Sequence, residues 1–405
     1  MLLYCNRSFW RVVIRIEGSV FFAKDTLAVG GLLAVVAGVL QYAIDRGWSW
    51  APQLPHHLGM LVLGSLVGFA VVFRMNLAWG RYWEAVSQLH IMYSKWADAF
   101  SQITAFSLVT IEQANASTEE GSAKIGRVSK MLKKTMEDFT ILSAITTDRL
   151  AHGDTTSMDM RAGVVPWSEQ ILMREELGSR QGDVTCDVTG ANRMPELALI
   201  GRHSMSRSST RLGVGQANSW TGVKYWVKAI PTAAELRTLT TSVDRPAVAM
   251  HWVIQDLARI SSDLCIAPPI QSRMYQELSN GMLGFNQAMK IADVPFPFPY
   301  AQLLLVLLTF YVCIIPVYMV CFTQSAIGAP VLTFLLFEGI WGINETAKEL
   351  ENPFGPDVND ITLADFHLRF VELCEEIFTA HQPGTTTEER LDADFPNTGQ
   401  KTSEL

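Results

Sequence analysis

Hydrophobic residues are concentrated in three stretches of the chain, near residues 26–44, 56–79 and 300–343, and charged residues gather in the remainder. A membrane-spanning helix needs about 20 predominantly apolar residues. Four segments meet this requirement and are predicted to be transmembrane helices: Thr26–Ile44, His57–Phe73, Tyr300–Phe322 and Ala326–Ile343. The alternative, buried helices of a large soluble protein, is disfavoured by the length of these runs and their scarcity of charges.

The fourth predicted span contains one acidic residue, Glu338. A carboxyl group at membrane depth is costly, so such residues normally face the interior of a helix bundle or water. Two locations remain open from the sequence: the bundle interior, or the membrane interface with the charge in water.

Positive charges are rare in the short connections between the spans. Residues 45–57 contain one Arg, Arg46, and residues 323–328 contain no charge. The positive-inside rule therefore places both chain ends and the long middle region in the cytoplasm or its equivalent. The predicted organisation is an N-terminal cytoplasmic segment (1–25), transmembrane helices 1 and 2 (26–79), a cytoplasmic helical region (80–299), transmembrane helices 3 and 4 (300–343), and a C-terminal cytoplasmic segment and tail (344–405).

The predicted cytoplasmic region also has a helical pattern, because its apolar residues recur at spacings of three and four. Helix is expected directly after the second span and in four further segments: 123–150, 233–239, 246–264 and 270–291. Residues 151–219 are dominated by Gly, Ser, Thr and Arg, and this composition is typical of a flexible insertion. No strand pattern is apparent, so the predicted fold class is all-α.

Composition narrows the functional classes. The 405-residue chain is 49% hydrophobic with a net charge of −8, which does not suggest a nucleic-acid partner. Its six cysteines form neither a zinc-binding spacing nor a disulfide framework, so free thiols are expected. No P-loop, H-E-x-x-H, G-x-S-x-G or dinucleotide-binding pattern is present. The expected partner is the lipid bilayer, and an enzyme is not predicted.

Three motifs carry a more specific signal. They occupy Phe73–Ala85, Phe296–Gln302 and Glu349–Asp360. In this order, and at these distances from four spans, they resemble the bestrophin family, especially its bacterial, plant and algal branch. The residues that carry the first and third motifs are Arg74, Asn76, Arg81, Glu84, Pro353, Phe354 and Gly355. The resemblance covers roughly residues 10–110 and 230–380.

The resemblance implies a homopentameric channel for chloride and other small monovalent anions, with a central pore lined by the second span. By position relative to Arg74, it assigns an apolar pore neck to Leu58, Val62 and Leu66. Five copies would form three stacked apolar rings, which can gate by dewetting. It also assigns a cytoplasmic aperture to Ile270, near the start of a predicted helix. The alternative is that the three neck residues face lipid or neighbouring helices.

Calcium is the one cofactor that the resemblance raises, and none is required for permeation. The matching positions are Asn352, Asp357 and Asp360, while the alternative role for Asp360 is to cap the following helix.

Three other functions remain open from the sequence: a cation-selective bestrophin homologue, a membrane-embedded carrier or enzyme using Glu338 and His57, and a membrane scaffold. Neither the plasma membrane nor a thylakoid or other organelle membrane is singled out.

Overall fold

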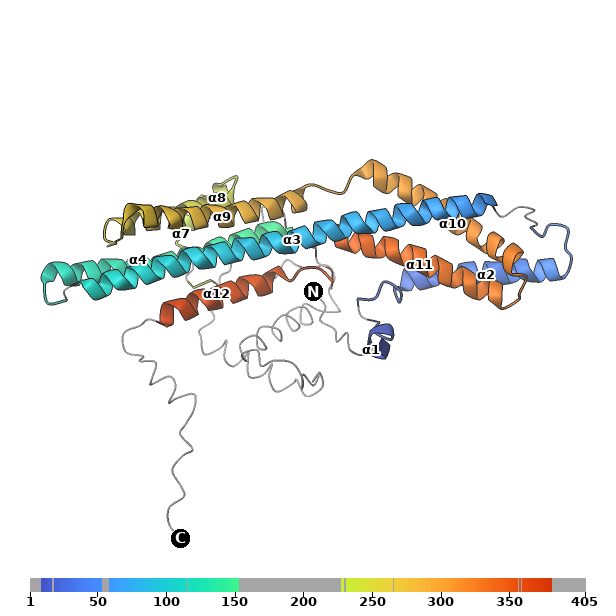
Figure 1. Ribbon diagram of the computed structural model, residues 1–405, viewed down its shortest axis with the longest axis horizontal. Helices are drawn as coiled ribbons and strands as arrows, with labels where there is room; N and C mark the ends of the chain where they lie inside the picture. Colours follow the sequence, from blue (N-terminus) through green and yellow to red (C-terminus); the bar gives the residue numbers. More distant parts are fainter. Residues whose placement is uncertain are drawn as a thin grey trace, which may run out of the picture. The chain divides into compact units, whose positions relative to one another are not determined.

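The computed structural model describes residues 9–16, 18–52, 58–114, 116–152, 227–228, 231–264, 266–355, 357 and 359–380. The described residues are helical, with no strand among them, and this confirms the all-α prediction (Figure 1). The helices are α1 (Phe9–Val13), α2 (Lys24–Asp45), α3 (Leu58–Gln113), α4 (Glu119–His152), α7 (Ala233–Thr241), α8 (Arg245–Ser261), α9 (Pro268–Asp293), α10 (Phe298–Thr323), α11 (Gly328–Glu351) and α12 (Leu363–Thr379).

The chain divides into two compact units. We call the first the membrane unit; its described residues fall within Met1–Gln88 and Gln287–Thr362. The second unit contains α4, α7, α8 and α12, with the last part of α3 and most of α9. The predicted insertion lies outside the described residues from position 153 onwards, as does the tail after residue 380.

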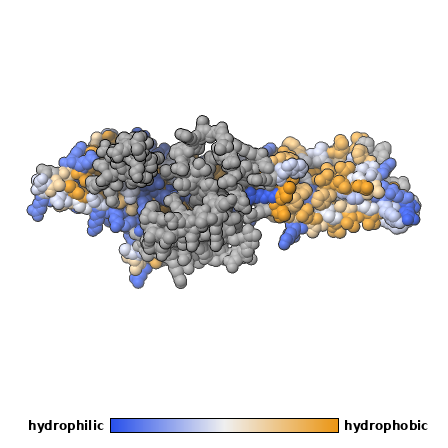
Figure 2. Space-filling view, turned by 90° about the horizontal axis from the view of Figure 1, so that it is seen from below, coloured by the Kyte–Doolittle hydropathy of each residue, from blue (hydrophilic) through white to orange (hydrophobic). Residues whose placement is uncertain are grey.

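The membrane unit is built from α2, the first part of α3, α10 and α11. Helices α2, α3 and α10 are long and apolar enough to cross a membrane. Helix α11, which contains the fourth predicted span, packs against both α2 and α10. Its Phe337 joins Val67, Val71, Leu304 and Leu308 in a buried core. In Figure 2 hydrophobic residues gather over this unit.

Helix α3 continues well beyond the predicted second span, as the sequence pattern after Arg74 indicated. One face is buried at regular spacings of three and four residues, at Val67, Val71, Arg74, Ala78, Tyr82 and Ala85. This periodicity matches the 3.6 residues of a helical turn and keeps one side of α3 inside its unit. The opposite side is exposed in the single chain.

The second unit is held by an aromatic core. Phe139 of α4 lies 5.5 Å from Phe100 of α3 and 6.3 Å from Phe370 of α12, measured between ring centroids. The predicted helices of this region are confirmed, with small shifts at their ends. A capping box between Thr232 and Glu235 starts α7, and this satisfies backbone N–H groups that the first helical turn leaves unpaired.

Two buried carboxyl groups face each other between α4 and α8. Asp256 lies within hydrogen-bonding reach of Asp138, and both side chains are almost fully buried. Lys134 Nζ lies 2.8 Å from Asp138, whereas Arg259 approaches Asp256 only to 3.5 Å. Burial and the neighbouring Asp138 raise the pKa of Asp256 to about 7. The pair therefore holds a proton that an isolated carboxyl would release.

This proton makes the stability of the second unit depend on pH. An unfolded Asp releases its proton near pH ~4, whereas the folded pair retains it to about pH 7. Stability should thus decline as pH rises between these values and stay low above them. We predict that Asp256→Asn raises the melting temperature at pH 8 and flattens its dependence on pH, as measured by thermal unfolding in detergent.

The matched control is Asp98→Asn, since Asp98 lies on α3 in the same unit with an exposed side chain. This variant should keep the wild-type slope. An Asp256→Asn protein as sensitive to pH as the wild type would show that other groups cause the effect.

Candidate functional site

Among its described residues, the membrane unit has one buried arginine, Arg74, on the inner face of α3. Its side chain is 4% exposed. Its Nε and Nη2 atoms donate to the two carboxylate oxygens of Glu351, with Nη2 at 2.8 Å, and its Nη1 donates to Asn344 Oδ1 at 2.8 Å. Both partners are on α11. The planar guanidinium matches a carboxylate with two parallel hydrogen bonds, the geometry that makes buried charge tolerable.

The second motif also reaches this arginine. The Arg74 guanidinium lies 5.6 Å from the centre of the Phe296 ring, within the range of a cation–π interaction. Tyr300, at the start of α10, donates its hydroxyl to the carbonyl of Ala70 at 2.9 Å. All three motifs therefore meet around the same stretch of α3.

Two to three turns further along α3, the motif residues Arg81 and Glu84 hold the end of α9. Arg81 Nη2 donates to the carbonyls of Ile291 and Val294, at 3.0 and 2.8 Å. The two carbonyls lie in the last turn of α9 and just beyond it, where the helix has no N–H group left to pair with them. A positive charge is therefore favoured at this helix end. Glu84 forms an ion pair with Lys290 at 2.8 Å. Asn76, the remaining polar residue of this motif, is exposed.

The third motif forms a tight turn after α11. Pro353 and Phe354 are buried, and Ile361 N donates to the Pro353 carbonyl at 2.9 Å. A Cβ at Gly355 would stand only 2.7 Å from Asp360 Oδ2. A larger residue at position 355 would therefore displace the side chains of Asp360 and Asn352, which gives a physical reason for glycine in the motif.

The calcium-site prediction can be compared with this turn. Asp360 Oδ2 accepts a hydrogen bond from the backbone N–H of Asp357 at 2.8 Å, and burial raises the pKa of Asp360 to about 7. Asp357 itself is exposed. Within the described ranges no three acidic, His or Cys side chains are grouped to hold a metal. Calcium needs six to eight oxygen ligands, so the residues as placed do not fit it.

Asp360 also does not take its alternative predicted role. Its carboxylate closes the turn that precedes it through Asp357, instead of bonding to the first turn of α12. The carboxylate therefore shapes the motif itself.

The three predicted neck residues lie on the exposed side of α3. Leu58, Val62 and Leu66 are 65%, 64% and 51% exposed in the single chain. They follow one another at intervals of four and so form a continuous apolar stripe. This side of α3 is opposite the face that carries Arg74.

Ile270 is the third residue of α9, which begins at Pro268, and it is 44% exposed. The predicted helix start is confirmed. Two consecutive prolines suit the first helical positions because their missing N–H groups would be unpaired there anyway.

Glu338 is in the bundle interior, so the interfacial alternative is wrong for this chain. Its side chain lies between α11 and α2, and neither carboxylate oxygen has a hydrogen-bond partner. His57, the other residue proposed for a carrier or enzyme, lies outside the described residues.

Sequence reasoning missed two partners in this site. Glu351 stands within the third motif, yet nothing in its spacing pointed to Arg74, which is 277 positions away. Asn344 carried a weak signal, as an amide within a largely apolar helix. The available clue was Arg74 itself, because a buried arginine needs an acidic partner.

Comparisons with known proteins agree with this geometry. Residues 221–373 match the family model described as bacterial/fungal bestrophin protein. A crystal structure of a bacterial bestrophin homologue from Klebsiella pneumoniae is similar with a TM-score of 0.56 and 13% identity, covering 88% of this chain and 99% of that one. A point variant of that homologue gives 0.55 and 13%, with 88% and 98% covered. No curated protein matches the chain.

The chain is an integral membrane protein, with apolar helices long enough to cross a bilayer and a fold shared with membrane-protein structures. The resemblance of its motifs to the bestrophin family is confirmed by the matched family model and by the shared fold. The first motif lies outside the matched residues, but its arginines contact the part that matches.

We predict that Arg74→Lys destabilises the membrane unit by about 2 kcal/mol, because lysine keeps the charge but cannot form the bidentate pair with Glu351. The measurement is the melting temperature of the purified protein in detergent. Arg46→Lys is the control, since Arg46 is exposed. Equal losses in the two variants would contradict a structural role for the buried pair.

Proposed function

We propose that the chain is one subunit of a bestrophin-like homopentameric ion channel that passes chloride and other small monovalent anions through a central pore. The observation that carries this proposal is the exposed apolar stripe of Leu58, Val62 and Leu66 on α3. The other side of the same helix is fixed inside the protomer by Val67, Val71 and its neighbours. Five such stripes around one axis would form three apolar rings.

We further propose that α11 is the fourth transmembrane helix. Its one acidic residue within the predicted span, Glu338, is buried against α2 and so need not face lipid. Four spans would return the chain to the side on which it started, as the distribution of Lys and Arg requires.

Anion selectivity is the less constrained part of the proposal, because apolar rings discriminate only weakly between anions and cations. It is supported by Ile270, which would place the positive end of five α9 helices around the cytoplasmic aperture. Calcium has no part in the proposed mechanism. The passage of ions requires no chemical step.

The first test concerns the neck. We predict that changing Leu58, Val62 and Leu66 together to Ala increases the open probability in planar bilayers, because smaller side chains widen the rings and let water remain in them. Leu61→Ala is the control, since Leu61 is as exposed as Val62 but lies about 100° around the helix. An unchanged current in the triple variant would show that these residues do not line the pore.

The second test concerns the permeant ion. With unequal sodium chloride concentrations on the two sides of the bilayer, the sodium and chloride equilibrium potentials have opposite signs, and the reversal potential should approach that of chloride. A potential that instead follows a sodium gradient would favour the cation-selective alternative.

A further inference from the structure

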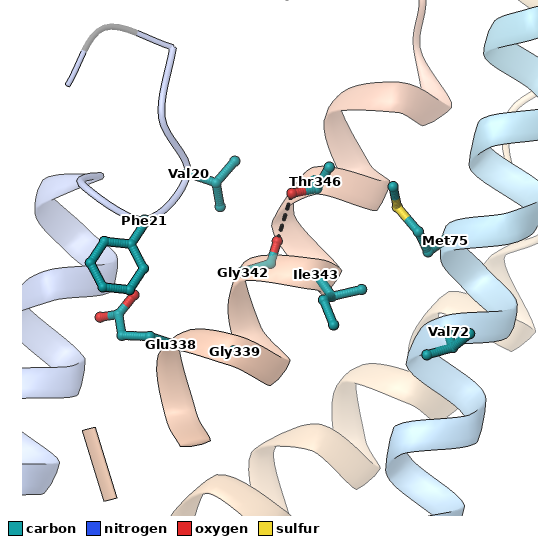
Figure 3. A pocket seen from close by; sticks show the side chains of 9 residues that line it. All are labelled: Val20, Phe21, Val72, Met75, Glu338, Gly339, Gly342, Ile343 and Thr346. Atoms are coloured by element: carbon teal, nitrogen blue, oxygen red, sulfur yellow. Dashed lines mark hydrogen bonds between the residues drawn. The ribbon is translucent and has the colours of Figure 1, made fainter. Parts of the chain in front are cut away.

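A pocket of about 460 Å³ lies in the membrane unit along one face of α11 (Figure 3). Its walls are mostly apolar: Val20 and Phe21 come from the segment before α2, Val72 and Met75 from α3, and Ile343 from α11 itself. The one hydroxyl in the lining, that of Thr346, already donates to the carbonyl of Gly342. The pocket therefore lies among helices of the membrane unit.

Two glycines of α11, Gly339 and Gly342, leave the pocket open. A Cβ built on either glycine would meet no atom within 4 Å. The space over these positions is thus free, and larger side chains could be placed there without a clash. An apolar chain could lie along this face of the helix.

The pocket also has one ionisable side chain, Glu338, and its carboxyl group has no partner. The residue is 2% exposed, and Oε1 is 2.7 Å from the position that a Cβ on Gly30 of α2 would occupy. The carboxyl group thus fills the room that this glycine leaves. Phe334 and Phe337 also lie against Gly30, and neither carboxylate oxygen of Glu338 has a hydrogen-bond partner. Buried carboxyl groups normally have partners, and one left without them needs an explanation.

The chemistry of the pocket selects a class of ligand. Apolar walls with a single carboxyl group fit a molecule that has an apolar body and one positively charged N–H donor. An anion would be repelled, and a neutral alcohol could offer the carboxylate no opposite charge. In Figure 3 the carboxyl group of Glu338 is drawn beside Phe21, at one end of the set of lining side chains.

We propose that this pocket binds a protonated alkylamine from the bilayer, with the ammonium group at Glu338 and the alkyl chain over Gly339 and Gly342. The amine enters along α11, and the Glu338 carboxyl group, which is packed against Gly30 with almost no accessible surface, turns toward the pocket to accept hydrogen bonds from the ammonium group. This site is independent of the proposed channel function, because binding requires no ion flow.

The test measures ligand-induced stabilisation of the full chain in phosphatidylcholine nanodiscs. Dodecylammonium is compared with 1-dodecanol, which has the same chain but no charge. In the wild type, the amine should give its half-maximal rise in melting temperature at a concentration about tenfold lower than in Glu338→Gln. The alcohol should act equally on both proteins. Glu345→Gln, on the same helix but paired with Lys348, should bind the amine as the wild type does.

A second variant keeps the carboxyl group and fills the pocket. Gly342→Leu should weaken amine binding by a similar factor, and it decides the matter alone if Glu338→Gln does not fold. The proposal is overturned if the amine acts on Glu338→Gln or Gly342→Leu within about twofold of its wild-type concentration. It is also overturned if the alcohol and the amine act alike on the wild type.

Discussion

The pairing of Arg74 with Glu351 is the interaction on which the membrane unit depends. A guanidinium inside a helix bundle is tolerable only when its charge and its donors are satisfied, and here Glu351 and Asn344 of α11 meet three of its N–H groups. The pair fixes the end of α11 against α3 across 277 positions of sequence. Removing either partner would leave an unpaired buried charge, which costs more than the pair itself contributes.

Two features of the unit follow from this pair. The turn after α11 has a defined position, because Glu351 also offers its carbonyl to Arg81 at 3.3 Å, and Gly355 then packs directly against Asp360. The rotation of α3 about its axis is also set. With Arg74 facing inward, Leu58, Val62 and Leu66 must face outward from the protomer. The proposed pore surface is thus determined by an ion pair that has no contact with the ions.

Much of this organisation could be predicted from the sequence, because it depends on local patterns. Runs of apolar residues defined α2 and α10, and spacings of three and four defined α3, α4 and α8. The motifs pointed to the right segments but not to their pairing, since Arg74 and Glu351 are neighbours only after folding. The same holds for Asp138 with Asp256, and for Glu338 beside Gly30. Each depends on helix packing that no short sequence window contains.

In the proposed channel, the exposed stripe of α3 belongs to one-fifth of a pore. An apolar stripe left exposed by one protomer can be covered either by copies of itself around an axis or by lipid alone. The number of chains in the assembly distinguishes these two arrangements. The direct measurement is native mass spectrometry of the protein released from detergent micelles. A homopentameric channel should give a single species with the mass of five chains. A species of one or two chains as the main product, under conditions that keep the protein folded, would contradict it.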